Sequence, residues 1–219
     1  MKPGFNLAPG TARIVLMRPT IKVGAQSTGG MFEPNADWTA QGRENLGRAI
    51  AEAQGKLGNV VVAYEEPAGG AAGAAEYQAL FTTVANSVMT YQFFSGNRLP
   101  TKKRKGQFEW GLGPGIGKVS GLQGADYALF VSTEDQFGST GRKVLQVAAI
   151  LAVGVAIKSG LHTGYAGLVD LKTGELVWLN ADAQMGGDVR TPEGAARRAE
   201  QLFKGFPGST PAALQVAGR

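Results

Sequence analysis

Residues 163–183 read TGYAGLVDLKTGELVWLNADA and carry the clearest structural signal in the chain. Two mainly apolar runs, Thr163 to Leu171 and Glu175 to Ala183, flank the short sequence Lys172-Thr173-Gly174. A glycine in a three-residue loop can supply the positive φ that such a turn requires. The stretch therefore predicts an antiparallel β-hairpin in the carboxyl-terminal half of the chain.

The rest of the sequence predicts a sheet and helices around this hairpin. Short apolar, β-branched runs indicate buried strands, and apolar residues three or four apart indicate helices. Thr191 is expected to cap the last helix, with Ala195, Ala199, Leu202 and Phe203 facing the core. The predicted strands are residues 13–17, 59–64 and 125–133, the predicted helices are 37–56, 76–92 and 191–203, and the glycine-rich connections are 18–34 and 95–124. This order predicts an α/β fold, a mixed β-sheet flanked by helices.

Composition sets the outer limits on function. The 219 residues suit one domain, expected at 11–207, with flexible segments at 1–10 and 208–219. With 43% apolar and 18% charged residues the chain is expected to fold. Having no cysteine and a single histidine, it offers neither a thiolate nor a histidine-rich metal site, so no metal or cofactor is predicted. A net charge of +5 permits contact with anionic lipid or wall polymer without selecting among such partners.

The glycine-rich sequence from Gly111 to Lys118 superficially suggests a phosphate-binding loop. In that motif a glycine stands five residues before the last glycine, and a serine or threonine follows the lysine. Here the two positions hold Leu112 and Val119. The sequence therefore predicts a structural loop rather than a nucleotide site.

A short basic cluster precedes this loop. Lys102, Lys103, Arg104 and Lys105, with Trp110 nearby, form a candidate contact for an anionic surface or an envelope partner. A solvated loop is the plainer interpretation. Nucleic acid is not expected as a partner, because one short cluster gives few phosphate contacts and the aromatic residues show no repeated stacking pattern.

Catalytic residues are not predicted. His162 is the only histidine, and a triad with Asp170 or with Ser139 and Thr140 has no supporting nucleophile motif, so a structural histidine is favoured. The acids nearest to strand ends are more simply turn or cap residues. A hydrolase that uses two of these acids is kept as a third alternative; they are Glu134, Asp135, Asp182 and Asp188.

Residues 144–157 are apolar apart from Gln146. As a helix the segment would extend about 21 Å, less than the ~30 Å hydrocarbon layer of a membrane. A buried core helix is the leading interpretation. The alternative is an interface with a membrane or with other copies, formed by Val144, Leu145, Leu151 and Val155.

Three stretches carry a resemblance to a known group of proteins: GADYALFV at 124–131, Gly141-Arg142, and the hairpin at 164–178 with its Asp-x-x-Thr-Gly-x-x-x-Trp pattern. They resemble bacterial envelope lipoproteins of uncharacterised function. These are related in fold to the curli secretion protein CsgG, the penicillin-binding-protein activator LpoB and the TolB amino-terminal domain. The resemblance covers about residues 11 to 207.

The resemblance implies an α/β sandwich without catalytic residues. It also implies a periplasmic protein tethered to the outer membrane through an amino-terminal lipid, carried on a cysteine upstream of this sequence. Such a protein would be a non-enzymatic accessory that binds another envelope protein. The alternative is an oligomer of the secretion-channel type that assembles through residues 144–157.

Overall fold

The computed structural model describes residues 1–54, 58–68, 73–93, 107–153 and 160–209. In chain order the elements are β1 (Arg13–Leu16), β2 (Thr20–Gln26), β3 (Phe32–Pro34), α1 (Ala36–Gln54), β4 (Val60–Ala63), α2 (Ala74–Val88), the π-helical turn η1 (Met89–Phe93), the 3₁₀ turn η4 (Pro114–Lys118), β5 (Tyr127–Gly138), α3 (Thr140–Val153), β6 (Leu161–Asp170), β7 (Leu176–Asp182) and α4 (Pro192–Leu202).

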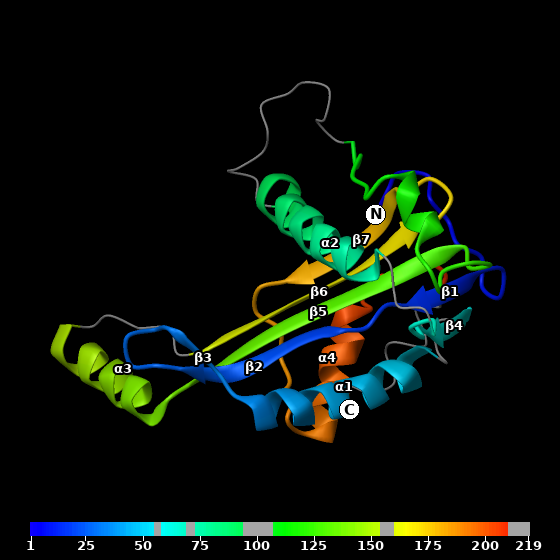
Figure 1. The fold of residues 1–219 in the computed structure, drawn as a ribbon. Helices are drawn as coiled ribbons and strands as arrows, with labels where there is room; N and C mark the ends of the chain where they lie inside the picture. Colours follow the sequence, from blue (N-terminus) through cyan, green and yellow to red (C-terminus); the bar gives the residue numbers. More distant parts are fainter. Residues whose placement is uncertain (55–57, 69–72, 94–106, 154–159, 210–219) are drawn as a thin grey trace.

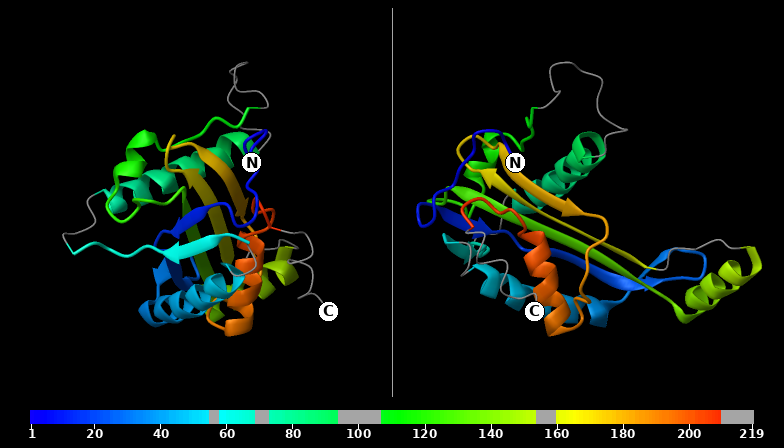
Figure 2. Two further views of the ribbon diagram at one scale, coloured as in Figure 1. Left: turned by 90° about the vertical axis from the view of Figure 1, so that its right-hand side faces the viewer. Right: turned by 180° about the vertical axis from the view of Figure 1, so that it is seen from behind.

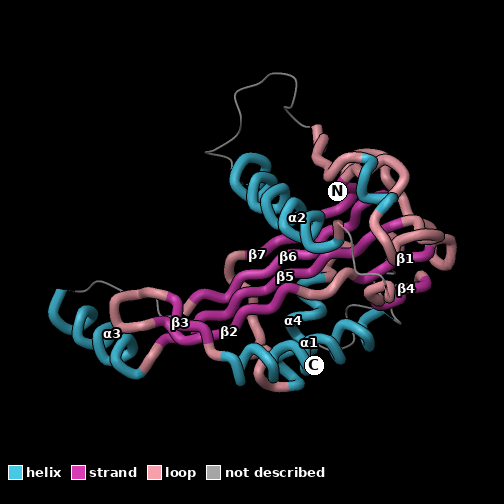
Figure 3. The backbone as a smooth tube through the Cα atoms, viewed as in Figure 1, coloured by secondary structure: helices cyan, strands magenta, loops and turns pink. Residues whose placement is uncertain are grey.

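The sheet is organised around β5, its longest strand (Figures 1 and 3). On one side β5 pairs antiparallel with β6, which pairs antiparallel with β7. On the other side β1 and then β2 pair with β5 in parallel, one after the other along the same edge. Beyond them β4 pairs with β1 in parallel and β3 pairs with β2 antiparallel. The predicted α/β fold with a mixed sheet flanked by helices is confirmed.

Strand β2 corrects the expectation of an irregular, glycine-rich connection at residues 18–34. Pro19 lacks an N–H group and ends the first strand, but the chain resumes as a strand at Thr20. Ile21 and Val23 are buried and Lys22 between them is exposed, which is the alternation of a strand with one covered face. A turn at Ser27 to Met31 then leads into β3.

Helices cover the sheet on both faces (Figure 2). α1 and α4 pack together on one face, where Leu46 and Ile50 of α1 join Leu129 and Val131 of β5 in the first core cluster. α2 covers part of the opposite face, and its Phe81 stacks on Phe130 with ring centroids 4.3 Å apart. The single sheet therefore separates two cores.

The predicted hairpin is confirmed as β6, β7 and the turn between them. Gly174 has φ +73°, and Asp170 accepts hydrogen bonds from the backbone N–H groups of Lys172 and Thr173. A Cβ added at Gly174 would lie 2.0 Å from the carbonyl oxygen of Gly113. The turn therefore needs glycine twice, for its backbone conformation and for the close approach of the 111–113 segment.

Helix α4 begins as the sequence predicts. The Thr191 side chain accepts a hydrogen bond from the N–H of Gly194, and Pro192 occupies the first turn. Ala195, Ala199 and Leu202 are all buried, so the predicted inward face is confirmed.

Candidate functional site

The far end of the sheet, away from β1 and β4, forms an arm that ends in α3 (Figures 1 and 2). β2, β5 and β6 reach into this arm, and β3 lies along it. Gln26 joins its parts: its backbone carbonyl accepts from Ser139 N–H, its side-chain oxygen accepts from Gly160 N–H at 3.0 Å, and its side-chain amide donates to the Gly30 carbonyl. One residue therefore ties the β2–β3 turn to both ends of the α3 insertion, through its side chain at Gly30 and Gly160 and through its backbone carbonyl at Ser139.

Helix α3 lies beyond the sheet and has no extended contact with another element of the described structure. Val144 is 64% exposed and Leu145 is 41% exposed. The interpretation of this segment as a core helix is therefore wrong for these two residues. Leu151 lies within α3, and Val155 lies outside the described residues.

Two further apolar side chains are exposed on the same part of the arm. Met31 ends the β2–β3 turn and is 72% exposed, and Leu161 begins β6 and is 39% exposed. The start of α3 contacts the turn, because a Cβ at Gly141 would lie 2.6 Å from Thr28 Oγ1. We call the exposed set Met31, Val144, Leu145 and Leu161 the arm tip.

A fully buried ion pair lies where the arm meets the body. Arg198 of α4 donates to both carboxylate oxygens of Asp135 of β5, at 2.7 and 3.0 Å. Its other N–H groups donate to the carbonyls of Gly186 and Gly187 and to Thr133 Oγ1. All five guanidinium donors therefore have acceptors, as a cation removed from water requires.

His162 completes this network. Its Nδ1 lies 2.7 Å from Asp135 Oδ1, and because a carboxylate can only accept, Nδ1 donates. Asp170 is at the opposite end of β6 from His162, where its carboxylate holds the hairpin turn. This geometry agrees with the predicted structural role, since His162 bonds to a carboxylate that Arg198 already holds.

The network also corrects the interpretation of Asp135 as a turn or cap residue. β5 continues to Gly138, beyond the predicted end at residue 133, so Asp135 lies inside the strand and is fully buried. It shares the α4 face of β5 with Leu129, Val131 and Thr133 because alternate residues of a strand face the same side.

A smaller ion pair lies beside this network. Arg190 and Asp188 form a two-bond contact at 2.7 and 2.9 Å, and the Arg190 guanidinium lies over the rings of Phe137 and Trp38. Hydrogen bonds from the Arg190 side chain lower the pKa of the Asp188 carboxyl, and burial opposes this effect in part. Asp188 also accepts from the Arg190 N–H, so it combines an ion pair with the turn role that the sequence predicts.

The lowered pKa of Asp188 leads to a pH-dependent prediction. Asp188→Asn is expected to reduce the free energy of unfolding by no more than about 1 kcal/mol at pH 7, because the pair is partly exposed. A depressed folded-state pKa adds stability above the ordinary aspartate pKa of about 3.9, and this stability is lost as pH falls through the folded value. Urea denaturation at pH 7 to 3 should show a constant difference between wild type and variant above about pH 5 that shrinks below about pH 4. A difference that stays unchanged down to pH 3 would contradict the assignment.

A polar groove of about 460 Å³ lies on the opposite face, between the sheet and the carboxyl-terminal half of α2. Its floor carries Lys22, Ser132, Glu134, Thr163 and Tyr165 from three neighbouring strands, and Thr82, Asn86 and Thr90 line its helical side. Glu134 and Asp182 both border this groove. Asp182 of β7 is paired with Gly164 of β6, so the two residues face the same side of the sheet. A Cβ added at Gly164 would contact Met185 and Leu202 of the first core cluster, on the α4 side. The Asp182 carboxylate is therefore directed to the face opposite to that of Glu134.

The four acids considered for hydrolysis are thus separated by the fold. Asp135 is engaged by Arg198, Asp188 by Arg190, Asp182 Oδ1 accepts from the N–H of Gln184, and Glu134 accepts from Gln136. A glycosidase-type mechanism needs two carboxylates that face one cleft. Of these four, Glu134 and Asp182 border one groove, but the strand register places their side chains on opposite faces of the sheet.

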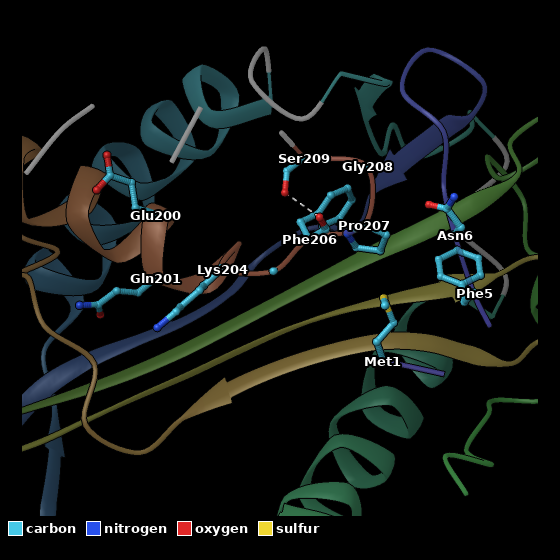
Figure 4. A pocket seen from close by; sticks show the side chains of 11 residues that line it. Met1, Phe5, Asn6, Glu200, Gln201, Lys204, Phe206, Pro207, Gly208 and Ser209 are labelled. Atoms are coloured by element: carbon cyan, nitrogen blue, oxygen red, sulfur yellow. Dashed lines mark hydrogen bonds between the residues drawn. The ribbon is translucent and has the colours of Figure 1, made fainter. Parts of the chain in front are cut away.

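A second cavity, of about 570 Å³, lies between the first residues of the chain and the end of α4 (Figure 4). Met1 and Phe5 approach it from one side, and Lys204 and Phe206 from the other. Its lining is mostly apolar, which suits an apolar group more than a charged substrate.

The basic cluster Lys102 to Lys105 lies outside the described residues. Trp110 is partly buried against the second core cluster, and its carbonyl accepts from the N–H of Leu176. The 111–118 segment packs on the hairpin turn through a bridge between Gly111 and Glu175, in agreement with a structural loop.

Within the described ranges, no group of three or more His, Asp or Glu side chains is placed to hold a metal ion. The helices of these ranges also include none long and apolar enough to cross a membrane.

No protein-family model and no curated protein matches this sequence. Among solved structures, the lipoprotein GNA1162 from Neisseria meningitidis is similar at 15% identity and a TM-score of 0.30, with 78% of each chain covered. The LpoB C-terminal domain from Escherichia coli is similar at 15% identity and a TM-score of 0.28, with 84% of this chain and 90% of that chain covered. The fold described above rests on the strand pairing of this chain itself.

Proposed function

We propose that this chain is a non-enzymatic accessory protein of the bacterial cell envelope that binds another envelope component through its arm tip. The observation that carries this proposal is the apolar α3 beyond the sheet, with Val144 and Leu145 exposed. Among the side chains that the structure describes, nine large apolar ones are exposed, and four of them form the arm tip. These four belong to segments at the same end of the molecule, and exposed apolar surface of this kind is typical of an interaction site.

The envelope location rests on the sequence resemblance at residues 164–178. With it comes the proposal of a periplasmic protein held at the outer membrane by an amino-terminal lipid. The basic cluster Lys102 to Lys105 remains a proposed second contact, with anionic lipid, wall polymer or the partner.

Binding to isolated Gram-negative envelopes tests the proposal. Wild type is expected to co-sediment with them saturably, and the double variant Val144→Asp/Leu145→Asp is expected to bind at least about tenfold more weakly, because each aspartate places a charge in an apolar contact. Leu80→Asp on α2 is the matched control, since Leu80 is 40% exposed, close to the 41% of Leu145.

The double variant binding envelopes as tightly as wild type would overturn the proposal. An equal loss in the Leu80→Asp variant would also contradict it, because the binding would then reflect general hydrophobicity rather than the arm tip.

Self-assembly is the second candidate function. A helix that is apolar on all sides is normally covered on all sides, and neighbouring copies in a ring could cover it. Light scattering with and without detergent tests this idea: a defined oligomer that the Val144→Asp/Leu145→Asp variant does not form would favour it. A monomer at all concentrations would remove it.

A further inference from the structure

The apolar part of α3 has the length of half a membrane. The ten residues from Val144 to Val153 include one polar residue, Gln146, and no charge. At about 1.5 Å per residue they extend about 15 Å, and the hydrocarbon core of a bilayer is about 30 Å thick. We propose that α3 inserts end-on into a single leaflet of an anionic membrane, an inference that rests on the arm tip being the binding site.

Because α3 packs on no other described element over an extended contact, we expect it to bind an apolar environment outside the body of the protein. Helices of fewer than about 12 to 15 residues are marginal in water without tertiary packing. α3 has 14 residues and lacks an extended contact with the other described elements. Burial of the exposed Val144 and Leu145 side chains in a second phase would supply further stabilisation.

The distribution of polar residues favours a membrane over a groove on another protein. A helix that docks in a groove or lies flat on a membrane needs a polar face that stays in water. Beyond Lys143, α3 has a single polar side chain, Gln146, so it has no continuous polar face. Lipid chains around an inserted helix would contact all of its sides.

The positive charges at the start of α3 indicate which end of the helix faces the lipid head groups. Arg142 and Lys143 precede the apolar ten residues, at the end of α3 nearest the sheet, and Lys143 is exposed. With the apolar end in the hydrocarbon layer, these cations lie at the level of the lipid head groups, where anionic lipids attract them. Met31 and Leu161 of the arm tip then lie beside the start of the helix, at the membrane surface.

Protein-free vesicles provide the direct test. The full chain is mixed with vesicles of phosphatidylcholine alone or with about 30% phosphatidylglycerol, and bound protein is separated by flotation. Wild type is expected to bind the anionic vesicles at least about tenfold better than the neutral ones, since two cations approach the surface. Val144→Asp/Leu145→Asp should abolish binding, Leu80→Asp should leave it unchanged, and Lys143→Gln should weaken it several-fold at low salt.

Depth of insertion gives a second, independent readout. Ile150→Trp places a fluorophore seven residues beyond Lys143, and lipids brominated along the acyl chain should quench its emission when vesicles are bound. Unchanged circular dichroism and urea midpoints in each variant exclude global unfolding as the cause of lost binding.

The outcomes separate this inference from the proposed function. If wild type binds intact envelopes through the arm tip but binds neither vesicle type, the occupant is a protein and leaflet insertion is overturned while the binding function stands. If the protein binds no vesicles but forms an oligomer in solution that requires Val144 and Leu145, the arm tip binds a second copy of this chain, and leaflet insertion is overturned. Binding that the double aspartate variant retains would overturn both the insertion and the role of the arm tip.

Discussion

Asp135→Ala is expected to reduce the free energy of unfolding by about 3–5 kcal/mol, which urea denaturation at pH 7 would measure. The substitution leaves the Arg198 guanidinium buried without its carboxylate, although Thr133 and two carbonyls still accept from it. It also removes the acceptor of His162, so β5 loses its ionic contact with α4 and its bond to the His162 side chain near the start of β6.

Glu134→Ala is the matched control because Glu134 is the neighbouring acid on the opposite face, where it is partly exposed. Its effect should stay within about 0.5 kcal/mol. The double variant Asp135→Leu/Arg198→Met should recover much of the loss, since it removes both charges together. Equal losses of stability in Asp135→Ala and Glu134→Ala would contradict the prediction that the buried Asp135–Arg198 pair stabilises the fold.

Gly174→Ala is expected to be nearly as damaging, with a loss of about 3 kcal/mol or more in the free energy of unfolding. The new Cβ meets the Gly113 carbonyl in addition to the cost of φ +73°. Either the hairpin turn or the 111–113 segment must move, and that segment donates a hydrogen bond from Leu112 to the Gly174 carbonyl.

Gly124→Ala is the control that separates the cost of a positive φ from the cost of the steric contact with Gly113. Gly124 also has a positive φ, of +76°, but nothing lies within 4 Å of its added Cβ. Its loss should therefore be only the conformational part, about 1–2 kcal/mol. If both variants lose the same stability, the contact between the turn and the 111–113 segment contributes nothing.

Local signals in the sequence were sufficient for the hairpin and for helix α4. The turn at Lys172-Thr173-Gly174 and the cap at Thr191 each depend on residues within a few positions, so no knowledge of distant partners is needed. β2 was missed for the opposite reason. Pro19 ends one strand, but β5 offers a second stretch of edge where pairing resumes, and nothing near Pro19 in the sequence shows this.

The buried network could not be predicted because its members come together only through the fold. Asp135 and Arg198 are 63 positions apart in sequence. One local sign exists: Arg198 lies three residues after Ala195 and four before Leu202, on the face that the helical pattern assigns to the core. A lone cation in such a stripe indicates a buried acidic partner, but only the strand register identifies Asp135.

The position of α3 outside both cores was the feature that the sequence predicted least well. Periodicity indicates a helix and its apolar character indicates burial, yet neither says whether the burial occurs within the same chain. Val144 is exposed because β5 and β6 carry α3 past the end of both cores.

The pairing of β5 with β1, β2 and β6 also determines how the protein responds to force. β5 and β6 lead into opposite ends of the α3 insertion, so a pull on an anchored α3 draws both strands along their own axes. The hydrogen bonds of β5 with β2 and of β6 with β7 run across that direction. Under such a pull these hydrogen bonds would have to break together rather than one at a time. The arm is therefore a stiff mechanical connection between the component that binds α3 and the rest of the protein.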